Sequence, residues 1–334
     1  MPEKKRVLIT LQQGPLFDDL VAADKMADLK EFAEVTLNDL DRAFTTEELA
    51  QRAKGVEAII TTWGCPKIDV SVVESAPKLK IISHAAGSVK YFINREVWDA
   101  GVVVTNAASA IALYVGEFSL CLALALLRTL PKYACGSPKD AWQNVSCVAN
   151  ETLFGKTVGI ISLSRTGRAF LRMLQPFKCN VLAYDPYFSP GEAAKLGVML
   201  VSLEELLSSS KVIALHAPVT DETINMLDAD KLKLIPDGAV FVNTARGILI
   251  DHDALTKELQ TGRFKAALDV THPEPLPEDH PLRKLPNVLI TPHIAGPADG
   301  RSDMFRTVVD DLKLFWSGKK PKNEVTKDML ETMA

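Results

Sequence analysis

The amino-acid sequence predicts an α/β fold with two domains, each built on a parallel β-sheet. Short apolar segments alternate with helical segments along nearly the whole chain, which is the pattern of repeated β-α-β units. Most apolar segments are continuous runs of Val, Ile, Leu and Ala, typical of strands that are covered on both faces. The chain has 334 residues, and at roughly 150 residues per domain this length suggests two domains.

The predicted strands fall into two series separated by a long helix. The first series comprises residues 6–11, 56–62, 79–84 and 102–105. The second comprises residues 157–163, 180–185, 211–216, 239–244, 265–270 and 288–291. Helices are predicted at residues 18–32, 45–52, 168–177, 203–209 and 252–261. Right-handed crossovers through such helices keep the strands of each series parallel.

The long helix is predicted at residues 111–130, with Asn106 and Ser109 before it as candidate helix caps. Its most apolar part, residues 118–127, is too short to span a bilayer, and we interpret it as a buried helix. We place the domain boundary just before this helix.

A final amphipathic helix, residues 299–317, follows the point at which the second sheet is complete. A return of the chain to the first domain explains this helix. The predicted domains are therefore residues 1–108 together with 298–334, and residues 109–297.

Composition and charge exclude several classes of partner. The 38 Lys and Arg residues against 42 Asp and Glu residues give a net charge of −4, which argues against nucleic acid or an anionic membrane as the main partner. The five cysteines are odd in number and widely spaced, and they form no C-x-x-C or Cys/His cluster. We expect reduced thiols in a cytoplasmic protein, and no metal site. The apolar run at residues 7–11 is too short for the core of a signal peptide.

A dinucleotide-binding pattern opens the second series of strands. Residues 155–168, GKTVGIISLSRTGR, are a strand, a tight turn and the start of a helix, and the next strand ends at Asp185. This is the architecture of a Rossmann β-α-β unit. A carboxylate at the position of Asp185 accepts hydrogen bonds from a ribose 2′-hydroxyl and repels a 2′-phosphate, so the sequence favours NAD over NADP.

The turn departs from the usual G-x-G-x-x-G pattern, because Ser162 and Ser164 replace the first two glycines and only Gly167 remains. If either serine needs a positive φ, the strain is on the order of 1 kcal/mol. Two interpretations stay open. A serine hydroxyl donates to a phosphate oxygen at the helix N-terminus, or the segment is a turn without a ligand.

Three further strands end in residues that suit hydride transfer to a 2-oxo acid. The segments are VFVNTARG at 240–247, ALDVTHPEP at 267–275 and LITPHIAG at 289–296. Arg246 can hold a carboxylate with two parallel hydrogen bonds, and His293 can donate a proton to the oxygen that gains charge. Glu274 beside it favours the charged imidazole. The carboxyl ends of strands are where open α/β sheets bind ligands.

Taken together, these motifs resemble those of the D-2-hydroxyacid dehydrogenase family, whose members include phosphoglycerate, glyoxylate and hydroxypyruvate reductases. The resemblance runs from about residue 61 to residue 318 and includes HAAGSVKYF (84–92), AIALYVGEF (110–118) and HAPVTDET (216–223). It implies a flavodoxin-like substrate domain, a Rossmann dinucleotide-binding domain, and a homodimer formed through the helix around Val115. It also implies reduction of a small 2-oxo acid to a D-2-hydroxy acid, or the reverse oxidation, with NAD(H).

The resemblance also implies which residues form the site. The catalytic residues are Arg246, Glu274 and His293, and the substrate carboxylate meets the backbone of Ala86, Gly87 and Ser88. The cofactor-binding residues are Ser164, Arg165, Thr166, Gly167, Asp185, Ala217, Pro218, Thr223, Thr244, Ala245 and Asp269. His272 is a departure, because related sequences often carry an acid there.

Two other functions are compatible with the same motifs. A catalytically impaired relative would bind a nucleotide or an acid as a sensor or scaffold, and whether the two serines leave room for the pyrophosphate separates it from an enzyme. Use of NADP would require Arg165 or another base to neutralise the 2′-phosphate against Asp185.

Overall fold

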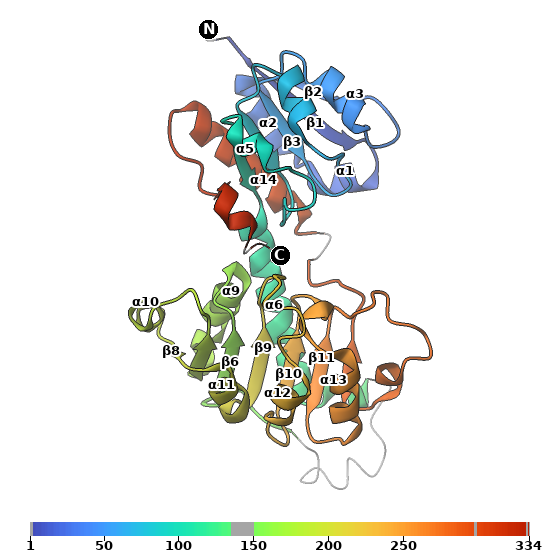
Figure 1. Cartoon of the computed structure of the whole chain (residues 1–334), viewed down its shortest axis with the longest axis vertical. Coiled ribbons are helices and arrows are strands. Elements are labelled where there is room, and N and C mark those ends of the chain that lie inside the picture. Colours follow the sequence, from blue (N-terminus) through green and yellow to red (C-terminus); the bar gives the residue numbers. More distant parts are fainter. Residues whose placement is uncertain (1–2, 135–149, 297–298, 332, 334) are drawn as a thin grey trace. The chain divides into compact units, whose positions relative to one another are not determined.

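The computed structural model describes residues 3–134, 150–296, 299–331 and 333, which form two compact units (Figure 1). Unit 1 comprises Met1–Ile111 and Gly296–Ala334, and unit 2 comprises Ala112–Ala295. The predicted boundaries lie after residues 108 and 297, and the units divide after Ile111 and Ala295. Cys135 and Cys147 lie outside the described residues.

Unit 1 is built on a six-stranded sheet whose parallel strands follow the flavodoxin-like order. Its strands are β1 (Lys5–Gln12), β2 (Ala33–Asn38), β3 (Ala58–Thr61), β4 (Ile81–His84), β5 (Val103–Asn106) and β13 (Glu324–Val325). They lie in the order β13-β5-β4-β3-β1-β2, with β13 antiparallel to β5 and the rest parallel. The parallel part is the 2-1-3-4-5 order of a doubly wound fold.

Helices cover both faces of this sheet. They are α1 (Pro15–Leu20), α2 (Ala23–Phe32), α3 (Thr46–Arg52), α4 (Val70–Ser75), α5 (Glu96–Asp99) and α14 (Arg301–Trp316). The single helix predicted at residues 18–32 is two helices, because α1 ends at Leu20 and α2 begins at Ala23. α14 packs against α1, α2, β4 and β5, so the chain returns to unit 1 at its end. Along β1, Val7 and Ile9 enter one buried cluster and Leu8 enters the other.

Unit 2 is built on a seven-stranded parallel sheet in the Rossmann order. Its strands are β6 (Thr157–Ile161), β7 (Asn180–Tyr184), β8 (Met199–Leu200), β9 (Val212–Leu215), β10 (Val240–Asn243), β11 (Lys265–Leu268) and β12 (Val288–Ile290). They lie in the order β12-β11-β10-β9-β6-β7-β8. Counted from β6, this is 3-2-1-4-5-6 with one further strand, which confirms the predicted fold class.

The described part of unit 2 includes the helices α7 (Leu130–Tyr133), α9 (Arg165–Leu174), α10 (Pro190–Lys195), α11 (Leu203–Ser209), α12 (Ala229–Lys233) and α13 (His252–Gln260). α9 begins at Arg165 rather than at the predicted residue 168, because the hydroxyl of Ser164 caps it by accepting from the Gly167 N–H. An early start brings the helix N-terminus directly to the end of β6.

Helix α6 (Ala108–Leu127) crosses from one unit to the other. It is long and apolar enough to span a membrane, but 44% of its most apolar window is buried in the protein. Leu122, Leu126 and Leu127 belong to the core of unit 2, whereas Leu113 and Cys121 are exposed. The interpretation of this helix as buried is therefore right for one face and wrong for the other.

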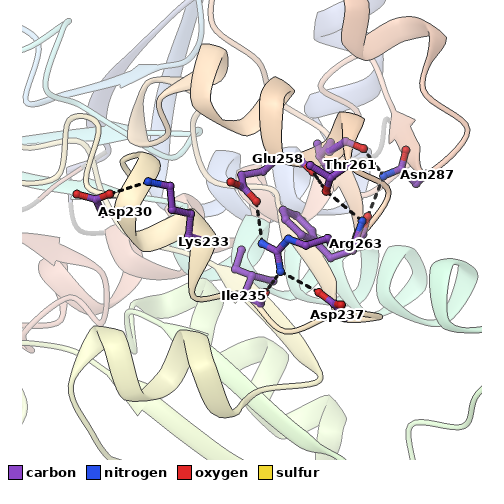
Figure 2. A network of polar contacts seen from close by, with 10 residues as sticks. Asp230, Lys233, Ile235, Asp237, Glu258, Thr261, Arg263 and Asn287 are labelled. Carbon is purple, nitrogen blue, oxygen red and sulfur yellow. Dashed lines mark hydrogen bonds and ion pairs between the residues drawn. The ribbon is translucent and has the colours of Figure 1, made fainter.

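A polar network fastens the amino-terminal edge of the sheet in unit 2 (Figure 2). The guanidinium of Arg263 donates to Ile235 O at 2.7 Å, to Asp237 Oδ1 at 3.0 Å and to Glu258 Oε2 at 2.7 Å. Asn287 Nδ2 donates to the carbonyls of Leu259 and Phe264. The network joins the last turn of α13 to the turns that precede β10 and β11. It fixes the end of α13 that lies opposite His252.

Candidate active site

The candidate site lies along the carboxyl edge of the sheet in unit 2. All pairs of neighbouring strands in this sheet are parallel, so the turns after β6, β7, β9, β10, β11 and β12 share that edge. The strand order reverses between β6 and β9, and ligands of doubly wound sheets bind at such a switch point. Every predicted site residue of unit 2 lies in one of these turns or at the start of the helix that follows.

The turn after β6 is tight and strained. Ser162 has a φ of 75°, a conformation that costs a residue with a Cβ about 1 kcal/mol or more. A Cβ at Gly167 would lie 2.1 Å from Ser162 O, so only glycine permits this approach of α9 to the strand. Ser164 Oγ also donates to His216 O at 2.9 Å, which ties the turn after β6 to the turn after β9.

Asp185 holds the same turn from the end of β7. Its Oδ2 accepts from the Leu163 N–H at 2.8 Å and from Ser162 Oγ at 3.2 Å, and its Oδ1 accepts from the Tyr187 N–H at 2.9 Å. A carboxylate offers about four lone-pair sites. These contacts therefore leave acceptor capacity at Asp185 for a ribose hydroxyl.

The remaining predicted cofactor residues stand in the turns after β9 and β10. Thr223 Oγ1 donates to Pro218 O at 2.7 Å, and Ala217 is buried beside it. Thr244 Oγ1 is hydrogen-bonded to Ser119 Oγ of α6 at 2.8 Å. Each of these contacts fixes the shape of a turn, as a ligand site on a rigid scaffold requires.

The turn that carries Arg246 is shaped by Asn243, a residue that the sequence analysis did not single out. Asn243 Oδ1 accepts from the Ala245 N–H at 2.9 Å, and its Nδ2 donates to Arg246 O at 3.0 Å. Arg246 itself is half-buried and donates to Ala245 O at 2.6 Å. An asparagine that closes a turn directly after a strand is the sequence signal for this role.

Glu274 and His293 are in direct contact. Glu274 Oε1 lies 2.5 Å from His293 Nδ1, and both side chains are nearly half exposed. His293 has a φ of 55°, an uncommon conformation for a residue with a side chain. The pair leaves Nε2 of His293 as the nitrogen that can exchange a proton with a substrate.

The carboxylate of Asp269 organises the loop that bears His293. It is 1% exposed, and it accepts from Thr291 Oγ1 at 2.6 Å, from the Ile294 N–H at 2.9 Å and from the Ala295 N–H at 3.0 Å. The His293 N–H donates to Asp269 O at 2.9 Å. Predicted as a cofactor residue, Asp269 lies in the site as the anchor of the histidine loop.

The predicted substrate residues Ala86, Gly87 and Ser88 belong to unit 1, in the turn after β4. Ala86 is buried, and its carbonyl accepts from the Ala107 N–H at 2.9 Å. Asn106 Nδ2 donates to Gly87 O at 2.6 Å. The turn therefore has fixed carbonyls at the carboxyl edge of the first sheet.

Two other histidines at strand ends stay neutral because they are buried. Burial lowers the pKa of His84 to about 4 and that of His216 to about 3. His84 Nδ1 is hydrogen-bonded to Thr61 Oγ1 at 2.8 Å. His272 is exposed. His293 is thus the strand-end histidine that combines exposure with a carboxylate partner.

Comparison with known proteins identifies the family. Residues 120–295 match the family model described as D-isomer specific 2-hydroxyacid dehydrogenase, NAD binding domain. The chain belongs to this family. Unit 2 is its NAD-binding domain, and the expected family resemblance is confirmed.

Relatives of known name support the same assignment. The chain is 33% identical to a D-3-phosphoglycerate dehydrogenase of Archaeoglobus fulgidus over 88% of this chain and 56% of that one. It is 33% identical to a glyoxylate reductase of Korarchaeum cryptofilum over 85% of this chain and 86% of that one. The chain thus spans a little over half the length of the phosphoglycerate dehydrogenase.

A solved structure with the same fold is the TT0316 protein of Thermus thermophilus. It has a TM-score of 0.72 and 31% sequence identity, and the match covers 96% of this chain and all of that one. The similarity therefore extends over both units.

We predict that the strain at Ser162 is relieved by glycine and kept by alanine. Both substitutions remove the hydroxyl that contacts Asp185, but only Ser162→Ala keeps a Cβ at a φ of 75°. The free energy of unfolding of Ser162→Gly should exceed that of Ser162→Ala by about 1 kcal/mol, measured by urea denaturation.

Ser208 on helix α11 serves as the control, because glycine weakens a helix relative to alanine by about 1 kcal/mol. There the order should reverse, with Ser208→Ala the more stable variant. Equal stability of the two Ser162 variants would contradict a strained turn at this position.

Proposed function

We propose that this protein reduces a small 2-oxo acid to a D-2-hydroxy acid, or catalyses the reverse oxidation, with NAD(H) as the hydride carrier. The observation that carries the proposal is the 2.5 Å contact between Glu274 and His293. It stands at the same sheet edge as the turn that presents Arg246. A carboxylate, an imidazole and a guanidinium together supply a proton donor and a carboxylate clamp.

The residues at the switch point fit a dinucleotide. The N-terminus of α9 reaches the end of β6 and attracts a pyrophosphate, and Gly167 permits this close approach of the helix to the strand. The spare acceptor capacity of Asp185 suits a ribose diol, and its negative charge disfavours the 2′-phosphate of NADP. When bound, NADH supplies the hydride that the carbonyl carbon receives.

Arg246, Glu274 and His293 have separate tasks in the proposed reaction. Arg246 binds the substrate carboxylate and polarises the adjacent carbonyl. His293 donates the proton on Nε2 to the carbonyl oxygen as that oxygen gains charge, and in the oxidation it accepts the proton from the hydroxyl. Glu274 fixes the ring through Nδ1 and stabilises the imidazolium form.

The substrate is proposed only as a class. Relatives are named for glyoxylate and for 3-phosphoglycerate, and both belong to reactions that interconvert a 2-oxo acid and a 2-hydroxy acid. The turn at residues 86–88 in unit 1 is proposed to bind the substrate carboxylate. The sensor or scaffold alternative is not favoured, because a binding protein has no need of the Glu274–His293 pair.

The test is a panel of glyoxylate, hydroxypyruvate, pyruvate and phosphohydroxypyruvate with NADH or NADPH. We expect NADH to be oxidised with at least one of these acids, and NADPH to be the poorer cofactor. Arg246→Gln should lower kcat/KM at least about 100-fold, because a charge-assisted double hydrogen bond is lost. Arg172→Gln, an exposed arginine on α9, is the matched control and should leave kcat/KM unchanged.

The binding of NADH is followed separately by the rise in melting temperature with ligand concentration. Binding of NADH without turnover on any acid would favour the sensor. Activity of Arg246→Gln within tenfold of wild type would remove the role of Arg246 as the clamp.

We also propose that the protein forms a homodimer through α6. The supporting observation is the apolar surface that α6 exposes, since Leu113 is 45% exposed and Cys121 is exposed two turns further along. Burying such residues against a second copy removes apolar area from water.

A cytoplasmic location is proposed as well, supported by the free thiols of Cys65, Cys121 and Cys179.

The dimer is tested by light scattering of Leu113→Lys. A lysine at the centre of an apolar interface should convert the dimer to a monomer, because the charge is desolvated without a partner. Leu234→Lys is the control. Leu234 is a leucine of unit 2 with a similar exposure, 38%, but it follows α12 and does not belong to α6. Dimers that survive the first substitution unchanged would argue against this interface.

A further inference from the structure

His252 is a buried histidine for which the proposed reaction has no role. It is the first residue of α13 and is 8% exposed, whereas the residue before it, Asp251, caps the helix by accepting from the Ala254 N–H. A polar ring buried at a helix start needs partners for both nitrogens. One of the two contacts of this ring leads to the loop that carries Glu274.

The two ring nitrogens of His252 bridge two backbone groups. Nδ1 lies 3.1 Å from Ile250 O, and Nε2 lies 3.1 Å from the backbone nitrogen of His272. A carbonyl only accepts and a backbone N–H only donates, so the proton of His252 sits on Nδ1 and Nε2 presents its lone pair. Only the neutral ring in this tautomer makes both bonds.

The surroundings of His252 favour that neutral ring. Burial is the largest effect on the pKa of His252 and lowers it, and the neighbouring His272 and His280 lower it further. The hydrogen bond to the Ile250 carbonyl and the charge of Asp251 raise this pKa, but the net shift is downward. The direction agrees with the hydrogen-bond pattern.

Gly247, in the turn that follows Arg246, packs against the same peptide bond, which joins Thr271 and His272. A Cβ at Gly247 would lie 2.1 Å from the carbonyl carbon of Thr271 and 2.6 Å from the nitrogen of His272. The Thr271–His272 peptide therefore touches Gly247 and donates to His252. Segment 246–252 thus fixes the backbone two residues before Glu274.

Burial does not hold the Glu274 side chain in place. The side chains of Glu274 and His293 are 42% and 48% exposed, and exposed ion pairs gain little from Coulomb attraction alone. The 2.5 Å contact then depends on how well the two backbones are placed. Asp269 places the backbone of His293.

We propose that His252 is a positioning residue for Glu274: its neutral imidazole anchors the His272 peptide and so sets the Glu274 carboxylate against His293. The inference rests on the proposed function for its kinetic effect. The effect of His252 on the contact between Glu274 and His293 can be tested without turnover.

The test compares two amides that differ by one methylene. His252→Gln keeps an acceptor long enough to reach the His272 N–H, whereas His252→Asn reaches only its own turn. Leu259→Ala, a core residue on the last turn of the same helix, is the control for loss of stability alone.

With the 2-oxo acid that the wild type reduces, kcat of His252→Asn should fall at least about tenfold, because misplacing a catalytic group by about 1 Å costs up to about 100-fold. The KM for NADH should stay within about twofold. His252→Gln should recover most of kcat, and Leu259→Ala should keep wild-type kcat per folded molecule.

A second measurement needs no turnover. The Nδ1–H signal of the His293 ring is followed by NMR in the protein without ligands, because Nδ1 is hydrogen-bonded to Glu274. This signal should weaken or vanish in His252→Asn, where the carboxylate no longer faces the ring, and should stay as in wild type in His252→Gln and Leu259→Ala. Failure of the wild type to reduce any acid would overturn the proposed function and leave this NMR measurement as the test of His252. A signal in His252→Asn equal to that in Leu259→Ala would overturn the role of His252.

Discussion

The geometry of the candidate site depends on the hydrogen bonds that the buried carboxylate of Asp269 accepts. An ion removed from water is tolerated only when hydrogen bonds replace its hydration, and Asp269 obtains three from the loop of residues 291–295. Charge-assisted hydrogen bonds are roughly twice as strong as neutral ones. They hold His293 at a positive φ, where its ring meets Glu274.

The parallel sheet turns separate stretches of sequence into one site. Arg246, Glu274 and His293 follow three neighbouring strands, β10, β11 and β12, and parallel pairing brings those strand ends to one edge. The glycines then control how closely the turns approach. Gly167 admits α9 to the end of β6, and Gly247 admits the turn of Arg246 to the Thr271 peptide. The side chains proposed to be catalytic are thus placed by backbone contacts that involve none of the atoms proposed to react.

The sequence was sufficient to predict the fold class and the strands that carry the site. Continuous apolar runs such as residues 211–216 and 239–244 became β9 and β10 because both faces of each strand are buried. The edge strand β2 was missed, since its alternating segment AEVTLN directly follows a helix without a glycine or proline between them. The two-residue strands β8 and β13 carry no period that a sequence pattern can reveal.

The contact between Glu274 and His293 was easier to predict than the contacts that position it. Residue type and strand-end position were enough to select Glu274 and His293, whose contact the structure shows. The positioning contacts depend on which backbone groups meet across the fold. The reach of His252 to the His272 N–H is one such contact, and no local pattern encodes it.

The role of Asp269 in positioning the loop of His293 is tested most directly by comparing kcat of Asp269→Asn with kcat of Asp311→Asn. Asp311 is equally buried and accepts from the backbone of Lys322 and Asn323, but it lies in unit 1. An amide in place of Asp269 sets its NH₂ group against a backbone N–H of the histidine loop. Asp269→Asn should lower kcat per folded molecule at least about 100-fold with little change in the Kd of NADH, while Asp311→Asn should keep wild-type kcat. Equal kcat in the two variants, or a loss confined to NADH affinity, would contradict this role of Asp269.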